Sequence, residues 1–393
     1  MTTRSRARVA ALLSAATIAS AGLLGACSSP GGSGNSPSAP ILIGQLTAGS
    51  GTYGSLSTEE SQGRAFAIDQ INAAGGINGR RLRLVTEDWQ SNTALITNDA
   101  TQLIRQGVVA VLGPDTSTAS VQLDPLMASA KVPMINSAGL NPAGAYSFSV
   151  QPLDYFTLVT QYAKDHGASK ICDLGAAGAS FEAVQAVIHP AAAATGIAVG
   201  TEISFDPTLP DLTPQVTELK AAGCTAIFAG ASGSSLALVA SAMTDLGMTS
   251  DLLMSQGANA TTTTLKQMEA SNAFTYFPIP AASLGSGVPA GDPKAAEIKP
   301  FVQAWTSKFG KPPTVPEVVG YANVEVLAAA LRSGATTGPA IKSYLESGKT
   351  ITTSLASFRF SPSLHAGADT VGGYFEMAHW DVQTSRFELA QQG

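Results

Sequence analysis

The chain has 393 residues, of which 45% are hydrophobic and 13% are charged, and its formal net charge is −6 at pH 7. This length exceeds one ordinary domain and suits two lobes of about 150 residues each. The composition provides enough apolar residues for two cores. The acidic balance, without a basic cluster, argues against nucleic acid as a partner.

An export signal occupies residues 1–27. Three arginines within residues 1–8 precede an apolar run over residues 9–25, which is the pattern of a signal peptide. The ending Leu24-Gly25-Ala26-Cys27 resembles the lipobox of bacterial lipoproteins, which implies that Cys27 is acylated and becomes the mature N-terminus. An ordinary signal peptide or a single membrane helix is the alternative, although the run is shorter than the about 20 apolar residues that a span requires.

A flexible tether is predicted between Cys27 and the folded part, because residues 28–40 are mainly Gly, Ser and Pro. The apolar strand Ile41–Leu46 then begins the fold without polar alternation. Such a strand is typical of a parallel sheet that is covered on both faces.

Strands and helices alternate after this strand, in two series of similar rhythm. The first series is helix 59–73, strand 82–87, helix 93–106, strand 108–112, helix 118–130 and strand 133–136. The second series is helix 155–166, strand 170–174, helix 181–194, strand 197–205, helix 212–222, strand 226–229, helix 234–246 and strand 252–255. Two βα series predict two doubly wound lobes of the α/β class.

The C-terminal third returns to both lobes. The Pro- and Gly-rich segment 278–293 predicts a crossing between them, long helices are expected at 293–309 and 315–333, and the alternating tail from Ser354 predicts antiparallel strands. We therefore expect a first lobe of residues 41–150 plus about 281–350. The second lobe is expected to contain residues 151–280 plus about 351–393.

Two cysteines remain after Cys27, namely Cys172 and Cys224. An even number of cysteines in an exported chain permits a disulfide. The interpretation that we favour from the sequence is two small apolar residues buried in adjacent parallel strands.

Several stretches resemble the extracytoplasmic solute receptors of ABC importers, of the branched-chain amino acid (Leu/Ile/Val)-binding type. They are Asp69-Gln-Ile-Asn-Ala-Ala-Gly-Gly-Ile-Asn-Gly-Arg-Arg-Leu, Glu87-Asp-Trp-Gln-Ser, Val111-Leu-Gly-Pro, Val132-Pro-Met-Ile-Asn-Ser, Leu219-Lys-Ala-Ala-Gly and Phe309-Gly-Lys-Pro-Pro. Their order and spacing cover the chain from about Ile41 to the C-terminus. The resemblance implies a type I periplasmic binding protein, with two doubly wound parallel-sheet lobes, a three-segment hinge and a ligand in the cleft between the lobes.

Two loops of the first lobe suit an anionic group. Residues 113–118 lead from a strand into a helix and offer hydroxyls and unpaired backbone N–H groups, and helix N-termini favour anions. The resemblance implies that Ser117, Ala138 and Gly139 contact the ligand's carboxylate and that Tyr53 lines the cleft. Capping of the helix by serine and threonine is the purely structural alternative.

The predicted ligand-binding residues come from both lobes. They are Tyr53, Thr116, Ser117, Ser137, Ala138, Gly139 and Leu140 in the first lobe, and Ser180, Phe181, Ala231 and Gln256 in the second. Leu140 stands where the family's amino acid receptors usually have threonine, and Gln256 stands where they bind the α-ammonium group with Asp or Glu. A neutral amide cannot form a charge-assisted bond, which is roughly twice as strong as a neutral one. The family thus implies an amino acid, whereas Gln256 favours an organic or aromatic acid, or an amide, without an ammonium group.

No cofactor, metal ion or catalytic residue is predicted. Residues 49–54 match the GxGxxG pattern, but the acidic pair Glu87-Asp88 follows them by more than the about 20 residues typical of a dinucleotide site. The four histidines show no metal-ligand spacing. An exported enzyme would need convergent catalytic groups that the sequence does not provide.

The sequence therefore predicts a monomeric, exported receptor on the outer face of the cytoplasmic membrane. We expect three partners, namely a small-molecule ligand, an ABC permease that receives it, and the membrane through a lipid anchor on Cys27. A receptor of the same fold that senses a ligand and signals to a membrane partner is the alternative.

Overall fold

The computed structural model describes residues 39–137, 144–150, 155–231, 233–268, 275–288, 295–366, 368–370 and 374–390. Residues 38–393 form one compact unit. The predictions for the signal peptide, Cys27, residues 28–38 of the tether, Ala138, Gly139 and Leu140 lie outside the described residues.

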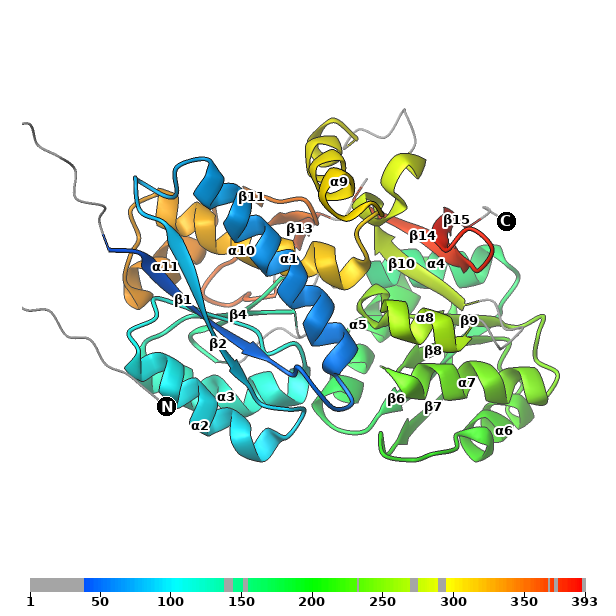
Figure 1. The fold of residues 1–393 in the computed structure, drawn as a ribbon. Coiled ribbons are helices and arrows are strands. Elements are labelled where there is room, and N and C mark those ends of the chain that lie inside the picture. Colours follow the sequence, from blue (N-terminus) through cyan, green and yellow to red (C-terminus); the bar gives the residue numbers. More distant parts are fainter. Residues whose placement is uncertain are drawn as a thin grey trace, which may run out of the picture. The chain divides into compact units, whose positions relative to one another are not determined.

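The first lobe is built on a parallel five-stranded sheet (Figure 1). Its strand order is β2-β1-β3-β4-β5, from β1 (Ile41–Thr47), β2 (Leu82–Asp88), β3 (Val111–Leu112), β4 (Met134–Asn136) and β5 (Ser147–Ser149). Three connecting helices are α1 (Gly54–Ala73), α2 (Thr93–Arg105) and α3 (Ser117–Ala130). Strand β5 is an addition to the prediction.

Both faces of this sheet are covered. Val111 and Met134 belong to a core cluster with α2 and α3, whereas the next residues, Leu112 and Ile135, belong to the cluster with α1. Because successive side chains of a strand point to opposite faces, helices must lie on both sides. This arrangement explains why the strands contain apolar residues without alternation.

The second lobe is built on a seven-stranded sheet with the order β15-β14-β10-β9-β8-β6-β7. Its strands are β6 (Lys170–Ala176), β7 (Ala198–Phe205), β8 (Ala226–Gly230), β9 (Leu252–Ser255), β10 (Thr275–Pro280), β14 (Phe375–Asp381) and β15 (Arg386–Leu389). Its helices are α4 (Tyr155–Asp165), α5 (Ala179–Thr195), α6 (Thr213–Ala221), α7 (Ser234–Asp245) and α8 (Thr262–Met268), and a short 3₁₀ turn, η1 (Gly257–Asn259), precedes α8. Strands β6 to β10 pair in parallel, and the β14–β15 hairpin adds the antiparallel pair expected in the tail.

The remaining segments connect the two sheets. They are η2 (Ala281–Gly287), α9 (Ala295–Phe309), α10 (Val315–Arg332), α11 (Gly338–Leu345) and a small sheet of β11 (Ile351–Thr352), β12 (Ser357–Phe358) and β13 (Ala368–Thr370). The first three residues of segment 278–293, which was predicted to cross between the lobes, belong to the end of β10.

The contacts of the C-terminal segment bear on the lobe boundaries. Ala366 bridges to Ser149 of β5, and Phe360 packs edge-on against Phe148. The lobe boundaries stay predictions, and these contacts favour a last boundary after Ala366 rather than at about residue 351.

Helices α1 and α10 approach each other through glycines. A Cβ atom on Gly63 would lie 2.0 Å from the carbonyl oxygen of Glu317, and one on Gly320 would lie 2.0 Å from that of Glu60. Real Cβ atoms do not come so close, so the absence of side chains at both positions allows the two backbones to touch. The pair therefore forms a close-packed frame on one face of the first sheet.

Cys172 and Cys224 form a disulfide. Cys172 lies in β6, and Cys224 lies two residues before the start of β8, which pairs with β6. The prediction that both lie in adjacent parallel strands is correct for Cys172 and wrong for Cys224, which lies just before its strand, and the favoured interpretation of two free, buried thiols is wrong. Neighbouring strands bring the two sulfur atoms within bonding distance, although 52 positions separate them in the sequence.

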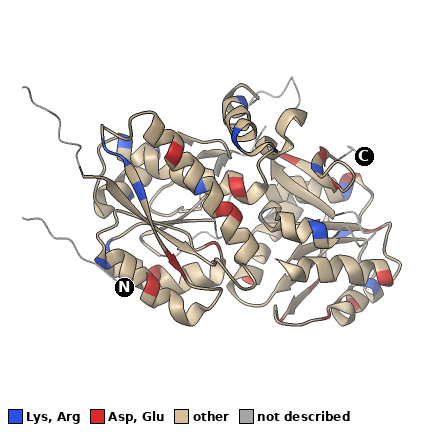
Figure 2. Ribbon diagram, in the orientation of Figure 1, with Lys and Arg blue, Asp and Glu red and all other residues tan. Residues whose placement is uncertain are grey.

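Charge is distributed over many elements. Figure 2 shows basic residues on several separate elements and acidic residues on both α1 and α10. Among the described helices, none is both long enough and apolar enough to span a bilayer.

Candidate functional site

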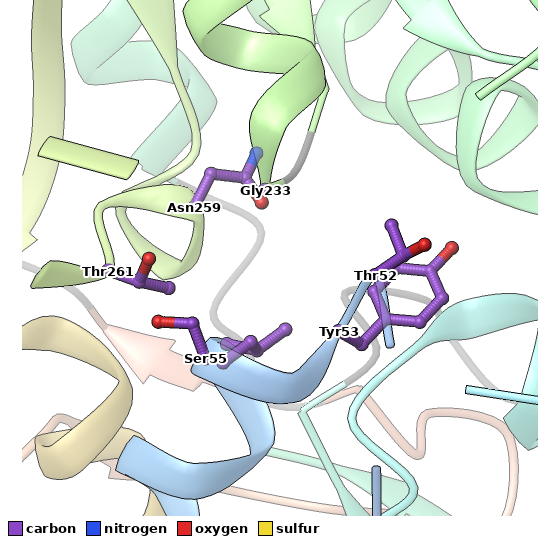
Figure 3. A pocket seen from close by; sticks show the side chains of 7 residues that line it. Thr52, Tyr53, Ser55, Gly233, Asn259 and Thr261 are labelled. Atoms are coloured by element: carbon purple, nitrogen blue, oxygen red, sulfur yellow. The ribbon is translucent and has the colours of Figure 1, made fainter. Parts of the chain in front are cut away.

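A small pocket lies where loops of the two lobes meet (Figure 3). The described residues that line it are Thr52, Tyr53, Ser55 and Leu56 of the first lobe and Gly233, Asn259 and Thr261 of the second. In this arrangement of the lobes its volume is about 10 Å³, which is room for about one water molecule. These residues follow strands β1, β8 and β9 in the chain, so the pocket lies at the carboxyl ends of strands, where doubly wound folds bind ligands.

The pocket offers neutral hydrogen-bonding groups. Figure 3 shows Ser55 and Thr261 approaching from opposite lobes, with Asn259 on the side of Thr261 and Tyr53 on the side of Ser55. Burial raises the pKa of Tyr53, so its phenol stays protonated and can donate a hydrogen bond. The described lining contains no charged side chain.

The loop after β1 is fixed by contacts with the loop after β2. The Tyr53 backbone N–H donates to Ser91 Oγ over 3.1 Å, and the Tyr53 ring lies 6.0 Å from that of Trp89, which is fully buried. Across the pocket, Gly233 has a φ of +59°, and a Cβ there would lie 3.1 Å from the carbonyl oxygen of Thr52. A side chain at position 233 would therefore crowd the loop of the first lobe, and glycine also suits the positive φ.

Glu59 joins the two lobes one helical turn beyond Ser55. Its Oε1 accepts from the backbone N–H of Thr262 over 2.8 Å, and its Oε2 accepts from the Thr314 hydroxyl over 2.8 Å. Burial raises the pKa of Glu59, and the hydrogen bonds from Thr262 and Thr314 act in the opposite direction. Thr262 begins α8 and directly follows the pocket residue Thr261.

A buried charged cluster lies beneath the two predicted anion loops. Arg64 Nη2 lies 2.6 Å from Glu60 Oε2 and 2.5 Å from Asp115 Oδ1, and the side chains are at most 1% exposed. Ser57 donates to Asp115 over 2.6 Å, and Ser137 donates to Glu60 over 2.7 Å. Burial, and then the charge of Asp115, raise the pKa of Glu60, while Arg64 opposes the rise. The cluster ties the loops at Asp115 and Ser137 to helix α1.

The predicted residues of the first lobe occupy different environments. Tyr53 lines the pocket. Thr116 stands at the N-cap of α3 without a side-chain capping bond, and Ser117, the first residue of α3, is buried. The hydroxyl of Ser137 binds Glu60.

The predicted residues of the second lobe surround the ends of β6, β8 and β9. Ser180 and Phe181 are half-buried in the first turn of α5, and the Phe181 ring occupies the space where Gly175 would carry a Cβ. Ala231 is buried in the core, and Gln256 is half-buried before η1. Of the predicted residues in the described segments, Tyr53 alone belongs to the pocket lining, and a ligand role for all of them stays a prediction.

The sequence prediction missed Thr52, Ser55, Asn259 and Thr261, all of which line the pocket. Each lies within five positions of a residue that was predicted, Tyr53 or Gln256. Their position in loops that follow strands was the available signal. In the described part of the chain, no group of three or more His, Cys, Asp or Glu could hold a metal ion.

Comparison with known proteins shows the family of this chain. Residues 40–372 match the family model described as periplasmic binding protein. The chain is 25% identical over 366 residues to the Leu/Ile/Val-binding protein homolog 3 of Brucella melitensis biotype 1, a match that covers 87% of this chain and 92% of that protein.

Solved structures have the same fold at low sequence identity. A type 1 periplasmic binding protein from Bordetella pertussis has a TM-score of 0.75 at 20% identity, with 89% of this chain and 99% of that one covered. The leucine-binding protein LivK of Thermotoga maritima has a TM-score of 0.74 at 17% identity, with 89% and 98% covered. The isoleucine complex of LivJ from Streptococcus pneumoniae has a TM-score of 0.73 at 20% identity, with 90% and 99% covered.

These similarities confirm the predicted fold class, with its two parallel-sheet lobes. The family consists of solute-binding proteins that act outside the cytoplasm, so the prediction that the chain is not an enzyme is also confirmed. The chain belongs to the periplasmic binding protein family and has the fold of its type I members.

Proposed function

We propose that the protein captures a small solute between its lobes and delivers it to the membrane permease of an ABC importer. The pocket lined from both lobes is the observation that carries this proposal. A solute that contacts both walls stabilises the closed arrangement through those contacts, and a permease can then recognise the closed form. We further propose a lipid anchor on Cys27, supported by the lipobox-like sequence.

The proposed solute has a carboxylate or carbonyl end and no ammonium group. The relatives whose names specify a ligand bind leucine, isoleucine or valine, so a branched or aromatic side chain of similar size is a reasonable starting point. The described pocket lining is neutral, and an ammonium group would lack the charged partner that makes such bonds strong. A 2-oxo acid, an aromatic acid or an amide therefore fits better than a free amino acid.

A thermal-shift screen tests the solute class. The soluble form lacking residues 1–27 would be melted with L-leucine, L-isoleucine, L-valine, their 2-oxo acids, their amides and aromatic acids. A ligand at 100 times its dissociation constant adds about 2.7 kcal/mol, which raises the melting temperature by several degrees. A shift by acids or amides alone supports the proposal. A shift by the amino acids would show that the argument from the neutral lining is wrong, and no shift at all would oppose solute capture.

The pocket itself is tested by Ser55→Val. The substitution removes a hydroxyl and adds methyl groups to the wall opposite Thr261, so we expect the dissociation constant of the best ligand to rise about tenfold or more. Thr58→Val is the matched control, because Thr58 is an exposed residue of the same helix. Isothermal titration calorimetry measures both variants. Equal affinities in Ser55→Val and the wild type would place the solute elsewhere.

Delivery to a permease requires a separate test in cells. Uptake of the radiolabelled ligand should disappear when the gene is deleted and return with the wild-type gene but not with Ser55→Val. Uptake that survives the deletion would favour the alternative of a sensing receptor.

A further inference from the structure

We propose that Glu59 is a positioning residue that sets solute affinity by holding the β9–α8 loop of the second lobe against α1 of the first. The inference rests on the proposed function for its effect on affinity. Glu59 is 8% exposed, and its two carboxylate oxygens bind groups from different segments, Thr262 and Thr314.

Glu59 lies directly behind both walls of the pocket. Ser55 precedes it by four residues on α1, which places the two on the same face of the helix. Thr261 directly precedes Thr262, the residue that donates its N–H to Glu59. Because Ser55 and Thr261 line the pocket from opposite lobes, the bond between Glu59 and Thr262 fixes the distance between the walls.

The first-lobe side of this bond is rigid. Thr314 and Glu317 form a capping box at the start of α10, and the Thr314 hydroxyl donates to Glu59. The glycine contacts at Gly63 and Gly320 hold α10 against α1. The contacts within the first lobe therefore hold the carboxylate of Glu59 in place, independently of its bond to the second lobe.

The second-lobe side is a helix N-terminus. Thr262 is the first residue of α8, and the first N–H groups of a helix have no partner within the helix. Thr261 Oγ1 accepts from the Thr264 N–H over 3.1 Å, so Thr261 and Glu59 together satisfy two of these donors. A carboxylate at this end interacts favourably with the helix dipole, and the bond is charge-assisted and hence strong.

The test compares Glu59→Ala, Glu59→Gln and the control Asp69→Ala. Alanine removes both bonds, whereas glutamine keeps an oxygen for the Thr262 N–H and an amide for the Thr314 hydroxyl. Asp69 is an exposed carboxylate of α1 that pairs with Lys308, which makes it a control for the loss of an acid from this helix. Two probes are used, L-leucine and its 2-oxo acid, 4-methyl-2-oxopentanoate.

We expect Glu59→Ala to raise the dissociation constant of whichever probe binds the wild type by about tenfold or more. Glu59→Gln should restore part of the affinity, because it keeps the hydrogen bonds without the charge, and Asp69→Ala should match the wild type. A lower melting temperature of ligand-free Glu59→Ala with an unchanged dissociation constant would overturn the inference, because Glu59 would then support only the fold.

Hydrogen exchange of the ligand-free protein provides a second test that does not depend on the identity of the solute. Exchange at residues 262–265 should be faster in Glu59→Ala than in the wild type or in Asp69→Ala, because the Thr262 N–H loses its acceptor. If the wild type binds neither probe, the proposed solute class fails while this second test still decides the inference. Unchanged exchange at these residues would refute the role of Glu59.

Discussion

Asp173 is a buried carboxylate on β6, the strand next to the edge strand β7 of the second sheet. Its side chain lies on β6 and is fully inaccessible to solvent, and among the described residues neither of its oxygens has a well-formed hydrogen bond. Burial, and then the charge of neighbouring Glu202 on β7, raise the pKa of Asp173 to about 8. Asp173 is therefore protonated in the folded protein at neutral pH.

This burial predicts that the second lobe loses stability as the pH rises. Between about pH 4 and pH 8 the folded state keeps the Asp173 proton and the unfolded state does not, so the free energy of unfolding falls by up to about 1.4 kcal/mol per pH unit. Asp173→Asn should remove this part of the pH dependence and stabilise the protein at pH 8. Urea unfolding at several pH values measures it, with Asp165→Asn, an exposed residue of α4, as the control. An unchanged pH dependence in Asp173→Asn would contradict the assignment.

At the scale of elements, the contact between α1 and α10 leaves no room for added volume. Gly320→Ala would place a Cβ atom 2.0 Å from the carbonyl oxygen of Glu60, so the helices must separate. We expect this overpacking to lower the free energy of unfolding by about 1–3 kcal/mol. Gly54→Ala is the control, since its nearest contact would be an ordinary 3.6 Å. Chemical denaturation of both variants checks the expectation, and equal stability of Gly320→Ala and the wild type would refute it.

The disulfide stabilises the strand pair β6–β8. Closing a loop across a separation of 52 residues restricts the unfolded chain and contributes about 4 kcal/mol in the chain-entropy model. The Cys172→Ala/Cys224→Ala double variant should therefore unfold at a markedly lower urea concentration than the oxidised protein. Reduction should move the wild-type midpoint toward that of the variant. A midpoint that neither change lowers would show that the bond adds nothing to stability.

At the scale of the whole molecule, the sequence predicted the two lobes because most strands and helices have a clear period and flanking turns. It missed strand β10, because Pro278 and Pro280 argue against a strand, whereas β9 and β14 pair with it on either side. It also missed the three-residue strand β5, which is too short to show a period. Long-range pairing determines both elements, and one local sequence does not contain that information.

The candidate site was only partly predictable for the same reason. Tyr53 was found through the family resemblance, and hydroxyl residues such as Ser55 and Thr261 are common in loops. Their convergence depends on how two loops about 200 positions apart in the sequence meet. The disulfide was missed for a related reason: the sequence suggested adjacent strands for Cys172 and Cys224, but it does not reveal whether the two sulfur atoms lie within bonding distance.

Membrane attachment is a property of the whole molecule and is tested by Cys27→Ala. If the lipid anchor is correct, the wild type should fractionate with membranes and Cys27→Ala should appear in the soluble fraction. Immunoblotting of the separated fractions measures this, and Thr3→Ala, outside the lipobox, is the control. Membrane association that is equal in both variants would argue against acylation of Cys27.

Strand β1 separates the point where the described chain begins from the pocket. The described chain begins at Ala39, whose carbonyl oxygen accepts from Arg80 Nε over 2.9 Å. The loop that leads to the pocket residues Thr52 and Tyr53 begins after Thr47, at the other end of β1. At roughly 3.3 Å per residue, this strand spans about 20 Å. The predicted tether before Ala39 can therefore be lengthened, shortened or replaced without changing the residues that line the pocket. If the proposed lipid anchor and solute pocket are correct, the distance from the membrane and the affinity for the solute can therefore be changed independently.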